Sequence, residues 1–66
     1  MFIIALRDPS GRVVGWDKNR DPSPWTPSYL SAKRWVSREA AGTRATVLVG
    51  RGLRAGYSVN IEEYEP

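Results

Sequence analysis

Arginine is the residue type in this chain with the greatest capacity for chemistry, and four arginines are spaced in ways that suggest a site. Arg34 and Arg38 are four residues apart, so on a helix they would form a basic ridge together with Lys33. Arg51 and Arg54 lie in a run with three glycines, whose backbone N–H groups could surround a phosphate. If the four arginines share one face, we expect them to bind nucleic-acid phosphates. The alternative is an ordinary solvated helix face and a flexible loop.

Catalysis is not expected from the residue types present. The chain contains no histidine and no cysteine, which removes the commonest general base and the best nucleophile. The glycine-rich run matches neither the Walker A pattern nor the dinucleotide-binding pattern. The acidic residues form no spaced set that would hold a metal ion. We therefore expect a protein that is not an enzyme and that uses no cofactor and no metal.

Tryptophan offers a second kind of site. Most of the aromatic side chains are expected to fill the core, but an exposed tryptophan beside arginine is common where proteins bind one another. Trp16 and Trp35 are the candidates, because Trp16 ends an expected strand and Trp35 lies on the flank of the apolar stripe of an expected helix. The alternative function is therefore a protein-binding adaptor or inhibitor with a Trp/Arg patch.

Length and charge limit the remaining possibilities. The 66 residues predict a single domain, and so small a domain can gain stability by forming a homo-oligomer. The net charge of +3 is uneven, because the acidic end, residues 62–66, has no basic residue. No segment is apolar enough to predict a membrane span. We expect a cytoplasmic accessory module of bacterial or phage type, whose partner is a nucleic acid or a larger protein.

The elements that must position these residues are predicted from local signals. Thr26, Pro27 and Gly42 fit the N-cap, first turn and C-terminal stop of a helix over Thr26–Gly42, with Trp25 packing on its first turn. Tyr29, Ala32, Val36 and Ala40 would form its inward stripe.

Four strands are predicted around this helix. Phe2–Arg7 and Arg12–Trp16 flank an Asp-Pro-Ser-Gly turn, and Arg44–Val49 and Tyr57–Ile61 flank the glycine-rich run Gly50–Gly56. The expected fold is α+β, in the order β-β-α-β-β, with two antiparallel hairpins and the helix on one face.

The segment 17–25 is predicted to be a proline-rich connector between sheet and helix. An alternative interpretation is a binding loop formed by Lys18, Arg20 and Trp25.

Overall fold

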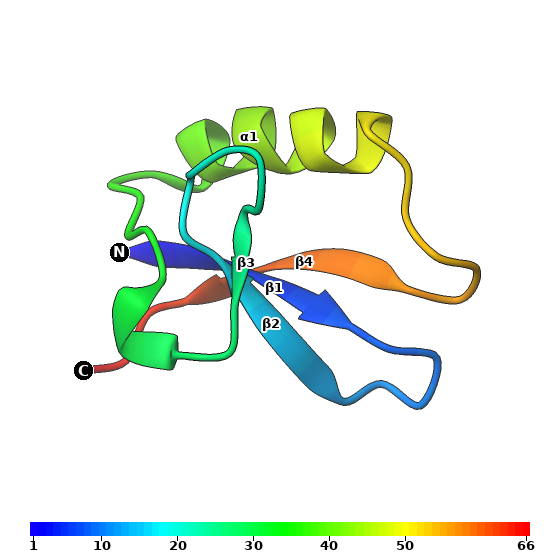
Figure 1. Cartoon of the computed structure of the whole chain (residues 1–66). Coiled ribbons are helices and arrows are strands. Elements are labelled where there is room, and N and C mark those ends of the chain that lie inside the picture. The colour runs from blue at the N-terminus through cyan, green and yellow to red at the C-terminus, as the bar shows by residue number, and fades with distance from the viewer.

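The computed structural model describes residues 1–66 as a four-stranded antiparallel sheet with one α-helix across one face (Figure 1). The elements are β1 (Phe2–Arg7), β2 (Val13–Asp17), β3 (Trp25–Thr26), the 3₁₀ helix η1 (Tyr29–Ser31), α1 (Arg38–Gly50) and β4 (Ser58–Glu63). The strand order is β3-β2-β1-β4. The predicted α+β class is confirmed. The predicted order β-β-α-β-β is wrong, because a short third strand and η1 precede the helix and only one strand follows it.

The hairpin of β1 and β2 forms as predicted, around a turn organised by Asp8. The Asp8 carboxylate accepts hydrogen bonds from the Ser10 hydroxyl at 2.6 Å, the Ser10 N–H at 2.9 Å and the Arg12 N–H at 3.1 Å. The bond from the Ser10 hydroxyl is the main reason that the pKa of Asp8 lies below its usual value. Gly11 closes the turn with a φ of 86°, a left-handed conformation that suits glycine.

Helix α1 does not lie where the sequence predicted a helix. The prediction covered Thr26–Gly42, but α1 starts after Ser37, whose Oγ accepts a hydrogen bond from the Ala40 N–H at 3.1 Å. Ser37 therefore caps the helix, which makes the predicted cap wrong. Gly42, expected to end the helix, lies inside α1.

The run Arg44–Val49, predicted as a strand, also belongs to α1. Its β-branched residues favour strands by propensity alone. Ala41 and Leu48, however, are two helical turns apart and pack together on the buried side chain of Ile4. Tertiary packing thus outweighs local propensity in this segment.

The residues predicted to start the helix instead form β3, η1 and an irregular segment. Thr26 pairs with Trp16 in the sheet. Trp25, expected to pack on a first helical turn, lies in β3 against the main core. Val36, which the predicted helix would have buried, is 81% exposed.

The main core lies between α1 and the sheet. Its centre is the buried cluster Ile4, Ala41 and Leu48. Partly buried apolar side chains surround that cluster: Phe2, Trp25, Trp35, Ala45, Val59 and Ile61.

The opposite face of the sheet is also covered. Ile3 and Ala5 of β1 point to this face and are fully buried. Above them Tyr29 of η1 packs edge-on against Trp16, with ring centroids 4.9 Å apart, and stacks on Tyr64 at 5.4 Å. Strand β1 is therefore buried on both faces.

Both chain termini lie at one end of the sheet, beside the segment that leads into α1 (Figure 1). The Tyr64 N–H donates to the Met1 carbonyl at 2.7 Å. Phe2 and Trp35 exchange two backbone hydrogen bonds of 2.8 and 2.7 Å, because β2 has already ended at Asp17 and leaves that edge of Phe2 free. The approach to α1 is thus fastened to the start of β1.

The run Gly50–Gly56, predicted as a hairpin tip, connects the end of α1 to β4. Strand β4 alternates in burial, since Val59 and Ile61 are partly buried whereas Ser58 and Asn60 are exposed. Neither α1 nor η1 has the length and apolarity needed to cross a lipid bilayer.

Candidate functional site

Two ion pairs hold the 17–25 connector against α1. The first joins Arg44 to Asp17, which is completely buried: Arg44 Nε lies 3.0 Å from Oδ2, and a second guanidinium nitrogen lies 3.1 Å from Oδ1. These hydrogen bonds raise the pKa of the Arg44 guanidinium above its ordinary value. The connector, predicted as a spacer, is therefore anchored at its start to the middle of the helix.

The second ion pair uses Arg51, one of the four arginines predicted to bind nucleic acid. Its guanidinium donates to both oxygens of Asp21, at 2.6 and 3.3 Å. Hydrogen bonding from Arg51 lowers the pKa of the Asp21 carboxyl. The charge of Arg51 is therefore balanced by a carboxylate on the same surface.

Arg34, Arg38 and Lys33 each lie over an aromatic ring. The Arg34 guanidinium carbon is 4.8 Å from the centre of the Tyr64 ring, and Arg34 also donates to the Tyr64 hydroxyl at 3.1 Å. The Arg38 guanidinium carbon is 5.0 Å from the centre of the Phe2 ring. Such cation–π contacts orient an exposed cation without neutralising it.

Lys33 extends this set toward the connector. Its ammonium nitrogen lies 5.3 Å from the Trp35 ring centre, and its backbone N–H donates to the Asp17 carbonyl at 2.9 Å. That backbone bond places the approach to α1 beside Lys18, the next residue of the connector.

Lys18 and Arg20 line an open polar depression of about 450 Å³ together with Ser31 of η1. No apolar side chain lines it, and both cations are free of ion pairs. Two cations and a hydroxyl are groups that bind an oxyanion. Lys18 and Arg20 are two of the three residues of the alternative binding-loop interpretation, and they lie at one depression. The third, Trp25, does not line it.

Most of the basic residues have no carboxylate partner. Of the ten basic residues, only Arg7, Arg44 and Arg51 form salt bridges, which leaves seven. Five of these seven lie in the neighbouring segments 18–20 and 33–38. We call them the cationic surface: Lys18, Arg20, Lys33, Arg34 and Arg38.

The structure does not bring all four predicted arginines together. Arg34 and Arg38 lie where α1 begins, whereas Arg51 and Arg54 follow its end, about 18 Å further along the helix axis at 1.5 Å per residue. The sequence analysis did not predict this separation. It ended the helix at Gly42, whereas α1 extends to Gly50 and so lies between the two pairs of arginines.

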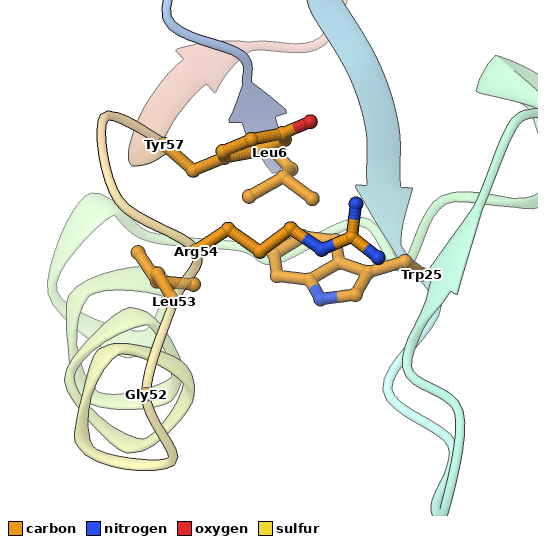
Figure 2. A pocket seen from close by; sticks show the side chains of 6 residues that line it. All are labelled: Leu6, Trp25, Gly52, Leu53, Arg54 and Tyr57. Carbon is orange, nitrogen blue, oxygen red and sulfur yellow. The ribbon is translucent and has the colours of Figure 1, made fainter.

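Arg54 lies in a different hollow, an apolar pocket of about 300 Å³ (Figure 2). Leu6, Trp25, Leu53 and Tyr57 form its walls, and Arg54 forms no salt bridge. Figure 2 shows the Arg54 side chain extending from the α1–β4 connection toward Trp25 on the facing wall.

The two tryptophans predicted to form a protein-binding patch are both partly buried. Trp16 packs edge-on against Tyr29, and Trp35 packs on the main core beside Phe2. The Trp35 indole N–H is buried and has no hydrogen-bond partner. The tryptophan that lines a pocket is Trp25, which the sequence analysis assigned to the first turn of a helix and, as an alternative, to a connector binding loop.

The acidic residues give no metal-binding arrangement, because no three of them come together. Comparison of the chain with protein-family models, with curated proteins and with solved structures finds no match.

Proposed function

We propose that this protein is a non-catalytic module that binds the phosphates of a nucleic acid through its cationic surface. The single observation that supports this most is the concentration of unpaired charge in two adjacent segments. Five cations that have no carboxylate partner follow the connector and the approach to α1. Arrays of this kind attract the nucleic-acid backbone by releasing its condensed counterions.

The aromatic contacts support the same proposal. Arg34 and Arg38 lie on the rings of Tyr64 and Phe2, so less side-chain freedom is lost when a phosphate binds. The guanidinium plane can still present two N–H groups to phosphate oxygens. The depression between Lys18 and Arg20 gives a place where a phosphate can approach two cations at once.

The proposal retains Arg34 and Arg38 from the sequence prediction and omits the other pair. Arg51 already has Asp21 as its partner, and Arg54 belongs to the apolar pocket. Sequence-specific base contacts are not part of the proposal. We expect the affinity to depend on backbone charge and little on base sequence.

The test is fluorescence anisotropy with labelled single-stranded and duplex oligonucleotides at low salt. The double variant Lys18→Gln/Arg20→Gln removes two charges from the cationic surface. We expect weaker binding, and we expect the negative slope of log K against log salt concentration to decrease in magnitude by about two.

The matched control is Arg12→Gln/Arg54→Gln, which removes the same charge from exposed residues outside the surface. It should bind much as the parent protein does. Equal loss of affinity in both double variants would show a general charge effect and no site, and absence of any complex at low salt would reject the proposal.

A further inference from the structure

The apolar pocket beside Arg54 combines two features that a simple surface hollow lacks. Its walls come from segments far apart in the sequence: Leu6 lies near the end of β1, Trp25 starts β3, and Leu53 and Tyr57 belong to the α1–β4 connection (Figure 2). All four of these apolar side chains are only partly buried. The pocket is thus a concave apolar site, at the lower end of the size range of ligand pockets.

The second feature is the charge at the pocket. Arg54 is the one charged residue among the lining residues, it is exposed, and it forms no salt bridge. A guanidinium beside an apolar pocket is complementary to a carboxylate that is attached to an apolar group.

The wall that bears Arg54 is held in place. The Tyr57 N–H donates to the Arg54 carbonyl at 3.0 Å and closes a turn. Gly56 lies so close to the β1–β2 turn that a Cβ there would be 2.8 Å from Pro9 Cγ. The site is therefore largely formed before a ligand arrives, which lowers the entropic cost of binding.

We propose that this pocket binds the C-terminal residue of a peptide or protein chain that ends in a large apolar side chain. The side chain would enter between Trp25, Leu53 and Tyr57. The terminal carboxylate would lie against Arg54. In an extended peptide, neighbouring side chains point to opposite sides, so an internal acidic residue next to an apolar one would not reach the same pocket. A C-terminal residue has its apolar side chain and its carboxylate on the same Cα, so the two groups can reach the pocket and Arg54 together.

The test is titration of the ¹⁵N-labelled protein with short N-acetylated peptides, followed by two-dimensional NMR. Acetyl-Gly-Gly-Phe with a free carboxylate should shift the signals of Leu53, Arg54, Tyr57 and the Trp25 indole N–H. The same peptide as a C-terminal amide, and acetyl-Gly-Gly-Ala as the free acid, should each bind at least about tenfold more weakly. Equal affinity of the acid and the amide, shifts confined to other surfaces, or no shifts at all would overturn the proposal.

Two further arms separate the alternatives. 3-Phenylpropionate has the ring and the carboxylate without peptide bonds, and equal affinity for it would show a small-acid site and overturn the assignment of a peptide. Arg54→Gln should reduce the affinity of the acid to that of the amide, whereas Arg12→Gln should leave both unchanged. Because Arg54 is not part of the cationic surface, the Arg54→Gln protein should keep its affinity for oligonucleotides. The two proposals can therefore fail separately.

Discussion

Asp17 is completely buried, and Arg44 of α1 donates two hydrogen bonds to its carboxylate. The Asn19 N–H adds a third at 2.9 Å, and the Asp17 carbonyl accepts from the Lys33 N–H. One aspartate therefore joins β2, the connector, the approach to α1 and α1 itself. The cationic surface depends on this junction, because the bond from the Lys33 N–H to the Asp17 carbonyl brings the start of segment 33–38 beside Lys18.

We expect Arg44→Met to destabilise the protein by about 3–5 kcal/mol, because the buried Asp17 carboxylate would lose its partner. The comparison is Arg51→Met, which breaks the exposed pair with Asp21 and should cost much less, because water screens an exposed ion pair. Urea denaturation followed by circular dichroism measures both. A domain of this size is stable by only about 3–10 kcal/mol, so a loss this large can unfold it, and an Arg44→Met protein without an unfolding transition is fully destabilised. Similar losses in the two variants would contradict the role given to Asp17.

Stability should fall in acid as Asp8 and Asp21 become protonated. Both carboxyls have a pKa below the unfolded value in the folded state, through Ser10 and Arg51 respectively. A lowered folded-state pKa contributes stability above the unfolded pKa, and this contribution is lost as the pH falls through the folded pKa. We expect a flat profile near neutrality and a decline below about pH 4. The decline should be shallower in Asp21→Asn, and an unchanged acid profile in that variant would contradict the assignment.

Gly56→Ala should be more damaging than Gly11→Ala. Both glycines have a positive φ, 84° and 86°, so both substitutions carry a backbone cost of about 1–2 kcal/mol. At Gly11 a Cβ would meet open space, whereas at Gly56 it would lie 2.8 Å from Pro9 Cγ. Thermal unfolding of both variants provides the comparison. Equal losses would mean that the connection to β4 does not touch the turn as described.

Ser37→Ala should cost about 1 kcal/mol, because the Ala40 N–H loses its capping acceptor. Thr26→Ala is the informative comparison, because Thr26 was the cap predicted from the sequence. It caps no helix and bonds only the Ser28 N–H at 3.2 Å, so its loss should be smaller. A larger effect at Thr26 than at Ser37, measured by chemical denaturation, would favour the helix boundary predicted from the sequence.

Salt should weaken nucleic-acid binding steeply. If all five residues of the cationic surface contact phosphates of a duplex, the slope of log K against log salt is about −4.5. Anisotropy titrations across a range of sodium chloride concentrations measure this slope. A slope near zero would show that any binding does not come from these charges.

The parts of the fold that sequence could predict are those with local causes. The turn at Asp8 depends on residues within four positions, and the alternation of Val59 and Ile61 is visible within β4 itself. The helix was predicted at the wrong place because Thr26 and Ser37 are both suitable N-cap residues. The choice between them depends on where Trp25 and Tyr29 find partners, and those partners lie in other elements.

In the candidate site, too, local features could be predicted and tertiary contacts could not. The exposure of Arg34 and Arg38 could be predicted from their residue type. The ion pair of Arg51 could not, because Asp21 is thirty positions away in the sequence. The joining of Lys18 to Lys33 also depends on a tertiary contact, through the Asp17 carbonyl.

Strand β1 lies between β2 and β4 and is covered above and below. Its amide protons can therefore meet solvent only when the whole domain opens, whereas those of the two-residue edge strand β3 need only a local separation. Deuterium should accordingly enter at Ile3, Ile4 and Ala5 last of all. The slowest of those rates would report the global free energy of unfolding under native conditions.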